Sequence, residues 1–282
     1  MATRRIDAHQ HFWRLDRGDY GWITPDRPAI YRDFGPGDLA PLLAGAGVTE
    51  TILVQAAPTV AETRFLLHTA RATTFVAGVV GWVDMAAADA PAVIAALAGD
   101  EYLRGIRPMI HDIADPGWML GRALEPAFRA LVELDLAFDA LVKPPHLPNL
   151  RVLLARHPDL RVVIDHGAKP DIARWGGARE ARAAWAGAMA ELARESGVAC
   201  KLSGLVTEAG PGWRADDLRP YVDHLLECFG PDRLLWGSDW PVVNLAGGYA
   251  AWWEAAGACL AALGPGERAK IFGETAARVY RV

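Results

Sequence analysis

This sequence has few cysteines and a small net charge. Only three cysteines occur in 282 residues, Cys200, Cys228 and Cys259, and their wide separation without a CxxC spacing excludes a disulfide framework and a zinc knuckle. The formal net charge of −5 gives no basic footprint for nucleic acid or an anionic membrane. We therefore expect a small-molecule partner, a cytoplasmic location, and no nucleic-acid or membrane partner. A homo-oligomer stays open, because nothing in the sequence bears on it.

Several motifs of other protein classes are also missing. No apolar run approaches the ~18 residues of a membrane span, and no apolar signal segment follows the start MATRRIDAHQHF. The absence of a G-x-S-x-G elbow argues against a serine hydrolase, and the absence of a Walker loop or complete G-x-G-x-x-G argues against nucleotide binding. Hydrophobic residues, in contrast, make up 52% of the chain, with eleven tryptophans, which is enough for a large buried core.

Short β-rich runs recur along the chain, and longer segments with helical spacing of apolar residues lie between them. This alternation predicts parallel strands joined by helical crossovers. The expected strands are eight: Arg5–Phe12, Thr51–Ala56, Phe75–Val83, Leu103–Ile110, Ala137–Val142, Arg161–His166, Val198–Ser203 and Arg233–Trp240. The expected helices include Val60–Arg71, Ala86–Leu97, Leu120–Leu134, Leu147–Arg156, Ala178–Ser196 and Leu218–Phe229.

Eight such units predict an α/β fold, a single distorted (β/α)₈ TIM barrel over residues 1–282. An open, doubly wound sheet is the structural alternative, because alternation alone does not separate the two. The barrel is favoured because unusual polar residues stand where several predicted strands end, the position of active sites in barrel enzymes.

The first predicted strand, RIDAHQHF, carries the first of these polar clusters. Strand alternation places Asp7, His9 and His11 on one face, so two imidazoles converge near the strand end. Two imidazoles can supply two nitrogen ligands to one metal ion or two hydrogen-bonding groups to one carbonyl substrate. A single histidine is more often a hydrogen-bonded core residue, but a His-x-His pair at this position favours a site.

The sixth and eighth predicted strands also end in polar residues. The apolar run RVVIDHG ends in Asp165 and His166. Polar groups at the end of a buried strand need hydrogen-bond partners unless they have a functional role. Asp239 lies in WGSDWP, where burial beside tryptophan makes ionisation costly without a cation or hydrogen-bond donors. The structural alternatives are that His166 is a buried histidine hydrogen-bonded to neighbouring groups and that Asp239 caps a helix.

The fourth predicted strand supplies Arg107, a permanent bidentate donor suited to a lactone carbonyl, its oxyanion or a carboxylate. Its structural alternative is an ion pair with Asp7 or Asp112. We expect His111, Lys143 and Trp240 to contact substrate. Lys201 in the seventh strand is a weaker candidate.

Five motifs in order resemble the amidohydrolase superfamily, in its sugar-lactonase branch. They are DxHxHFW at residues 7–13, LRGIRP at 103–108, DHxxKP at 165–170, KLSGL at 201–205 and WGSDWP at 236–241. The resemblance spans residue 5 to about residue 280. It implies a metal or substrate site at His9, His11, His166 and Asp239, with Asp239 taking a proton from the attacking water.

The chain departs from the metal-rich members of that superfamily. Its fourth strand offers Arg107 but no bridging carboxylate, and its fifth ends without a histidine. We therefore expect at most one divalent ion, zinc foremost, held by His9, His11, His166 and Asp239, or no ion at all.

The resemblance implies a hydrolase that opens an aldonolactone, of the L-fucono or L-rhamnono type, by water attack. Asp239 would be the base, Arg107 with a metal or the His9/His11 pair would stabilise the oxyanion, and His166 would orient the reactants. The donor of a proton to the ring oxygen stays open among His111, Lys143 and Lys201. The alternatives are a metal-dependent decarboxylase of an aromatic acid, a hydrolase of a dicarboxylate lactone, and an inactive sugar-binding barrel.

Overall fold

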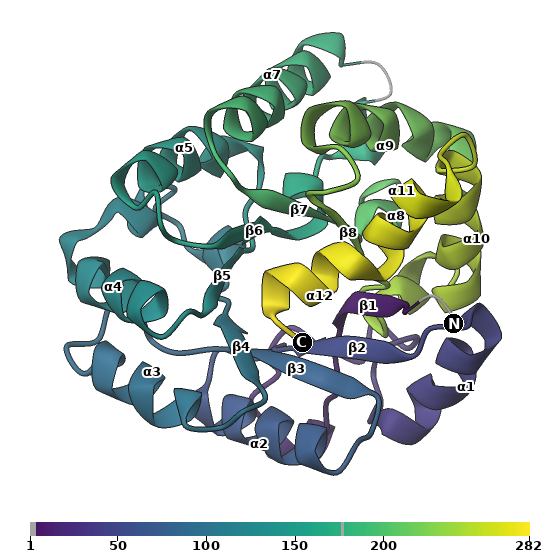
Figure 1. Ribbon diagram of the computed structural model, residues 1–282. Helices are drawn as coiled ribbons and strands as arrows, with labels where there is room; N and C mark the ends of the chain where they lie inside the picture. Colours follow the sequence, from purple (N-terminus) through teal and green to yellow (C-terminus); the bar gives the residue numbers. More distant parts are fainter. Residues whose placement is uncertain (1–3, 176–177) are drawn as a thin grey trace.

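The computed structural model describes residues 4–175 and 178–282. Its strands form one parallel eight-stranded sheet in which each strand pairs with its neighbours in sequence, from β1 to β8 (Figure 1). A doubly wound sheet would reverse its strand order, so this topology confirms the predicted barrel. The strands are β1 (Ile6–Gln10), β2 (Glu50–Val54), β3 (Val76–Gly81), β4 (Leu103–Ile106), β5 (Ala137–Ala140), β6 (Val162–Ile164), β7 (Ala199–Leu202) and β8 (Leu234–Trp236).

The barrel closes between β1 and the segment that follows β8. Gln10 forms a parallel bridge with Trp240, His11 N donates to Trp240 O at 2.7 Å, and Asp239 N donates to His9 O at 2.8 Å. The closure lies at the carboxyl ends of the strands and therefore joins the first and last motifs of the sequence.

Helices between the strands cover the outside of the barrel (Figure 1). The predicted helices are all present, and α2 (Val60–Arg71) and α5 (Leu147–Arg156) have the expected bounds. The sequence analysis did not name α1 (Pro36–Ala46) or α10 (Tyr249–Cys259). The longer helices are α1 (Pro36–Ala46), α2 (Val60–Arg71), α3 (Ala90–Ala98), α4 (Glu125–Glu133), α5 (Leu147–Arg156), α7 (Arg179–Glu195), α9 (Ala215–Phe229) and α10 (Tyr249–Cys259).

The C-terminal segment closes the amino-terminal end of the barrel. It consists of α11 (Pro265–Ala269), a π-helical turn (Lys270–Glu274) and α12 (Thr275–Tyr280), which crosses the barrel centre in Figure 1. Its side chains Ala276, Val279 and Tyr280 join a buried cluster with alternate residues of the strands, such as Ile6 and Val54. The interior is therefore a packed core and not a channel.

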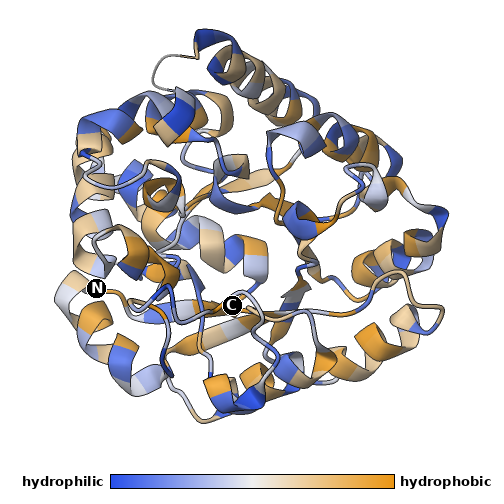
Figure 2. Cartoon of the chain, turned by 180° about the vertical axis from the view of Figure 1, so that it is seen from behind, coloured by the Kyte–Doolittle hydropathy of each residue, from blue (hydrophilic) through white to orange (hydrophobic). Residues whose placement is uncertain are grey.

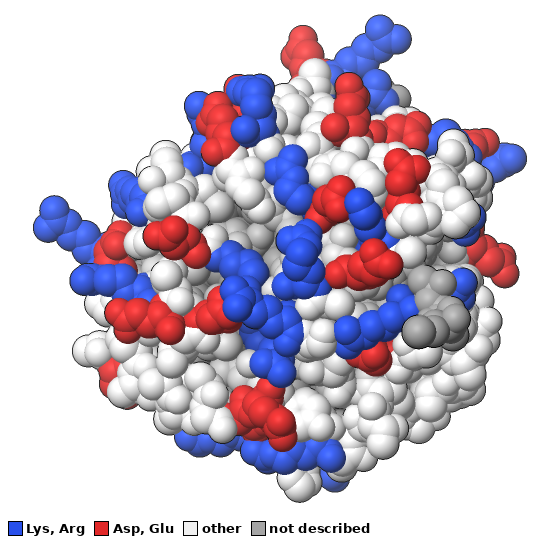
Figure 3. Space-filling view, viewed as in Figure 1, with Lys and Arg blue, Asp and Glu red and all other residues white. Residues whose placement is uncertain are grey.

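The outer helices carry hydrophobic and hydrophilic residues in alternation along their length, as expected of helices packed on one side (Figure 2). Basic and acidic side chains are interspersed over most of the face that carries α12 (Figure 3). Among the described residues, no helix has the length and apolar character needed to cross a membrane. The predicted single domain over residues 1–282 includes residues 1–3 and 176–177, which lie outside the described part.

Candidate active site

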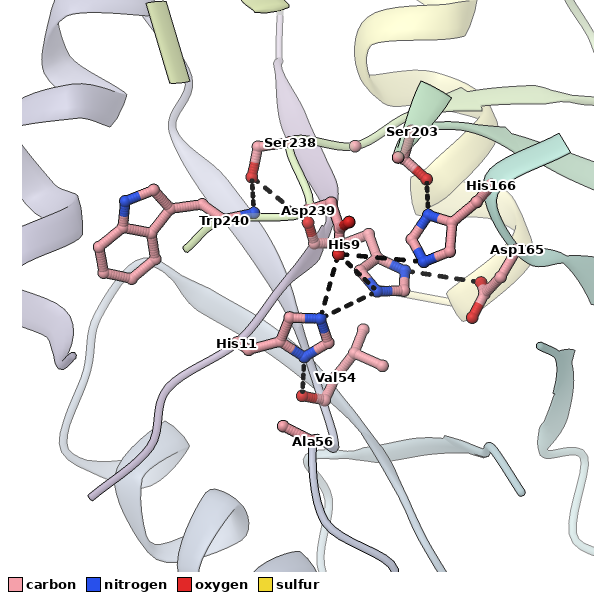
Figure 4. A network of polar contacts seen from close by, with 12 residues as sticks. His9, His11, Val54, Ala56, Asp165, His166, Ser203, Ser238, Asp239 and Trp240 are labelled. Atoms are coloured by element: carbon pink, nitrogen blue, oxygen red, sulfur yellow. Dashed lines mark hydrogen bonds and ion pairs between the residues drawn. The ribbon is translucent and has the colours of Figure 1, made fainter. Parts of the chain in front are cut away.

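A cavity of about 290 Å³ opens at the carboxyl ends of the strands. His11, Arg107, His166 and Asp239 line it. His9 lies beside His11 and His166, so the residues predicted from the sequence come together (Figure 4). The observed strands end earlier than expected. His11, Arg107, His166 and Asp239 therefore lie on the segments just beyond β1, β4, β6 and β8.

His9 and His11 lie two residues apart in the first motif, and their side chains point toward each other. Their Nε2 atoms are 3.2 Å apart, and Asp239 Oδ1 lies 3.7 Å from His9 Nε2 and 3.3 Å from His11 Nε2. The opposite nitrogen of His11, Nδ1, lies 2.8 Å from the carbonyl oxygen of Val54. Because that oxygen only accepts, Nδ1 carries the ring proton and Nε2 of a neutral His11 presents a lone pair.

His166 reaches the cavity through an unusual turn after β6. Residues 166–169 all have positive φ, between 49° and 62°, a left-handed conformation that non-glycine residues rarely adopt. Such strain persists at functional sites when the surroundings enforce it. Here the His166 Nδ1 atom lies 2.8 Å from Ser203 Oγ, and a Cβ built on Gly204 would come within 2.5 Å of the same nitrogen.

Asp239 also has a left-handed backbone, with φ of 58°. Burial alone would raise the pKa of its carboxyl, but the neighbouring histidines, His166 foremost, hold the pKa below its ordinary value. Burial lowers the pKa of His166 to about 3, although Asp239 opposes this shift. At neutral pH the site therefore contains a carboxylate beside a neutral His166.

Arg107 is held on both sides by buried groups. Its Nη1 donates to Asp165 Oδ2 at 3.2 Å and its Nη2 donates to the Gln55 carbonyl. Gln55 in turn donates to the Arg107 carbonyl at 2.8 Å. The partner is Asp165, so the expected alternatives of Asp7 or Asp112 were wrong.

Asp7 has another role at the barrel closure. Its Oδ1 accepts from the backbone of Ser238 at 2.8 Å and of His9 at 3.2 Å. The carboxyl therefore ties the end of β8 to β1, because both donors belong to the two segments that close the barrel.

The three residues expected to contact substrate differ in their position relative to the cavity. His111 lines the cavity, with its Nε2 3.0 Å from Asp112 Oδ2. Lys143 is exposed, and its Nζ lies 3.3 Å from the His111 carbonyl without lining the cavity. Trp240 turns away from the histidines, and its indole packs edge to face against Phe12 and Phe34.

Among the lining residues not singled out from the sequence are one aromatic and two basic side chains: Trp22, Arg27 and Lys169. Lys169 belongs to the DHxxKP motif, so the motif was a usable signal for it. Its ammonium pairs with Glu208 at the rim. Trp22 donates from its indole to the Ala56 carbonyl at 2.7 Å. All three come from segments outside the strands, where no two-residue alternation indicates which way a side chain points.

The donor set fits a divalent metal ion. His9, His166 and Asp239 each offer a ligand atom within 4.8 Å of the others, and imidazole and carboxylate are donors that zinc prefers. The lone pair of His11 Nε2 also faces the Asp239 carboxylate at 3.3 Å. Two acceptors in such contact call for a positive group facing both, either an N–H donor such as that of a neighbouring imidazole or a metal ion.

Comparison with known proteins agrees with this geometry. The amidohydrolase family profile matches residues 6–282. L-Fucono-1,5-lactonase from Burkholderia ambifaria is 53% identical over 286 residues, covering 99% of this chain and 96% of the relative. L-Fucono-1,5-lactonase from Burkholderia multivorans is 39% identical over 293 residues, covering 99% and 97%.

A crystal structure of an amidohydrolase from Burkholderia multivorans with bound zinc matches the fold with a TM-score of 0.91 at 38% identity over 99% of each chain. The chain described here therefore belongs to the amidohydrolase family. Within that family, its relatives place it in the sugar-lactonase branch that the five motifs predicted.

Proposed function

We propose that this protein hydrolyses an aldono-1,5-lactone of the L-fucono type to the aldonic acid. The observation that carries the proposal is the near full-length identity of 53% to an L-fucono-1,5-lactonase. The cavity supports it, because a carboxylate, an arginine and neutral imidazoles meet there at the carboxyl ends of the strands. A lactone keeps its leaving oxygen tethered to the product, so a base, a polarising group and a water suffice for ring opening.

Asp239 is the base in this mechanism. Its lowered pKa keeps it ionised at neutral pH, and it lies at the cavity wall where it can accept a proton from the attacking water. His166, whose Nε2 lies 3.9 Å from Asp239 Oδ1, orients the water or the carbonyl beside it.

Arg107 stabilises the charge that develops on the lactone carbonyl oxygen. Asp165 and Gln55 hold its guanidinium at the cavity wall before the substrate arrives. A donor fixed in advance needs no reorganisation during the reaction, which is why such groups lower barriers effectively.

We propose one divalent ion, zinc, as the metal that this site accepts, held by His9, His166 and Asp239 with His11 adjacent. When bound, it would add Lewis-acid polarisation to that of Arg107. The zinc-bound relative at 38% identity supports this choice.

The proton for the ring oxygen comes, in our proposal, from His111. Of the three candidates, Lys201 is fully buried in the barrel interior and Lys143 does not line the cavity, whereas His111 does. Burial lowers the pKa of His111, and contact with Asp112 partly opposes that shift.

A panel of aldonolactones followed with a pH indicator tests the function. We expect the fastest acid release with L-fucono-1,5-lactone, slower release with L-rhamnono- and D-arabino-type lactones, and none above background with the Asp239→Asn protein. Release of CO₂ from an aromatic acid would favour the decarboxylase alternative, and binding of the lactone without turnover would favour the inactive sugar-binding barrel.

We also propose a cytoplasmic location. The support is limited to the cysteines: Cys200, Cys228 and Cys259 are all free, as suits a reducing compartment. A thiol titration of the protein in intact cells, compared with the secreted fraction, tests it.

A further inference from the structure

Lys201 of β7 lies inside the barrel, directly below the histidine cluster. Its side chain is fully buried, and its Nζ has three neighbours: Asp139 Oδ2 at 2.6 Å, Asp165 Oδ1 at 3.0 Å and His9 Nδ1 at 3.1 Å. The carboxylates of Asp139 and Asp165 thus face the ammonium where solvent does not reach it. The lactonase mechanism proposed above does not use this group.

An ammonium has three N–H donors and no acceptor. The third neighbour, His9 Nδ1, must therefore accept a hydrogen bond from Lys201, and a neutral His9 then carries its only ring proton on Nε2. His9 is then neutral, because the ring nitrogen that accepts a hydrogen bond from Lys201 at 3.1 Å carries no proton.

The contacts on the other nitrogen of His9 agree with this assignment. His11 Nδ1 donates to the Val54 carbonyl, so His11 Nε2 has a lone pair, and it lies 3.2 Å from His9 Nε2. That approach is favourable only if His9 Nε2 carries the proton. With this assignment, Lys201 donates to His9, His9 donates to His11, and His11 donates to the Val54 carbonyl.

Two contacts favour the opposite tautomer, and both are longer. Asp165 Oδ1 lies 3.5 Å from His9 Nδ1, and Arg107 Nη1 lies 3.4 Å from His9 Nε2. Both groups have nearer partners, because Arg107 Nη1 donates to Asp165 Oδ2 at 3.2 Å and Asp165 Oδ1 faces Lys201 at 3.0 Å.

We infer that Lys201 is a positioning residue that fixes His9 as an Nε2–H donor aimed at the centre of the histidine cluster. An N–H at this point can stabilise the developing oxyanion, whereas a lone pair would bind a metal ion. Lys201 thereby shifts the site toward hydrogen-bond catalysis and weakens its hold on a divalent ion. The role in catalysis rests on the lactonase function proposed above, but the tautomer does not.

The C-terminal helix α12 contacts the carboxylate that pairs with Lys201. Tyr280 of α12 donates from its hydroxyl to Asp139 Oδ2 at 2.7 Å, the same oxygen that Lys201 contacts. Tyr280 touches Asp139 but makes no hydrogen bond with Lys201 or His9 among the described contacts. Tyr280→Phe is therefore a matched control that alters the network without removing the Lys201 contact to His9.

Nitrogen-15 NMR of the histidine side chains, without added metal and in the wild-type protein, tests the tautomer directly. Comparison with a His9→Gln sample assigns the resonances. We expect a protonated Nε2 and an unprotonated Nδ1 for His9, unchanged in Tyr280→Phe. A protonated Nδ1 on His9 overturns the inference, whether or not the protein hydrolyses lactones. The expected tautomer in a protein without lactonase activity instead contradicts the proposed function alone.

Removal of the ammonium supplies the second test. In Lys201→Met, His9 Nδ1–H can donate to Asp165, the carboxylate–histidine arrangement that supports metal ligands, so we expect zinc affinity to rise about 10- to 100-fold. We expect kcat of the metal-free enzyme to fall about 10²- to 10³-fold with little change in KM, as when an oxyanion donor is lost. Unchanged zinc affinity together with an unchanged kcat overturns the inference.

Because Lys201→Met leaves two buried carboxylates without a cation, the double variant Asp139→Asn with Lys201→Met is prepared beside it. It retains Asp165 as the acceptor for His9 and removes the second buried charge. Should both variants fail to fold, the wild-type NMR measurement still decides the inference.

Discussion

Asp239 and His11 lie 228 positions apart in the chain, yet Asp239 Oδ1 is 3.3 Å from His11 Nε2. The contact exists because the segment after β8 pairs with β1, where Asp239 N donates to His9 O at 2.8 Å. The base and the histidine pair are thus assembled by the same closure that completes the barrel, and the site forms only when the last strand has docked on the first.

Replacement of Asp239 by asparagine tests the base. The amide keeps the shape of the carboxylate but cannot take a proton from water, so we expect lactone hydrolysis to fall about 10²- to 10⁴-fold. Circular dichroism and a thermal melt establish that the variant is folded. Turnover close to the wild-type value in a folded variant would rule out Asp239 as the base.

Arg107→Met compared with metal removal tests which group polarises the carbonyl. Since Arg107 is already held at the cavity wall, we expect its loss to cost about 10²- to 10³-fold in kcat and to exceed the cost of chelation. The measurement is kcat before and after chelation, with metal content determined in parallel. Complete loss on chelation that zinc restores, with only a mild Arg107→Met defect, would return the polarising role to the metal.

Gly204→Ala tests the positioning of His166. A Cβ there would lie 2.5 Å from His166 Nδ1, and the φ of +62° already disfavours any side chain. We expect kcat to fall about 10²-fold because a displacement of about 1 Å is enough for such a loss. The left-handed conformation should also cost about 1–2 kcal/mol of stability, measured by denaturant unfolding.

Gly187→Ala is the matched control for that substitution. A Cβ at Gly187 of α7 meets nothing within 4 Å, so we expect wild-type kcat and a gain of about 1 kcal/mol from helix propensity. Equal activity in the two alanine variants would show that His166 tolerates displacement.

His111→Asn and Lys143→Met together test the proton donor. His111 lines the cavity, so we expect its loss to lower kcat about 10²-fold, with a smaller effect on lactones that carry a better leaving oxygen. Lys143 lies outside the lining, and its variant should remain within about twofold of wild type, a change too small to reflect general acid catalysis. The reverse order of the two effects would identify Lys143 as the donor.

Much of the fold and part of the site were accessible from the sequence. Alternation of strand and helix patterns predicted all eight strands, and the polar residues at or just beyond the ends of β1, β6 and β8 predicted the convergence of His9, His11, His166 and Asp239. These predictions succeed because period-2 alternation sets the face of a residue in a strand, and parallel strands bring their carboxyl ends to one edge.

Residues beyond the strand ends do not follow the two-residue alternation, so the sequence does not indicate which way their side chains point. The left-handed turn at residues 166–169 rotates His166 and Lys169 into the cavity, and the aromatic ring of Trp240 packs against Phe12 and Phe34 instead. The pairing of Arg107 with Asp165, and of Lys201 with Asp139 and His9, likewise became visible only in the tertiary structure. The sequence by itself determined which chemical groups reach the mouth and interior of the barrel. Barrel closure and backbone turns decided their partners, because each buried charge pairs with whatever opposite charge the packed strands bring within hydrogen-bond distance.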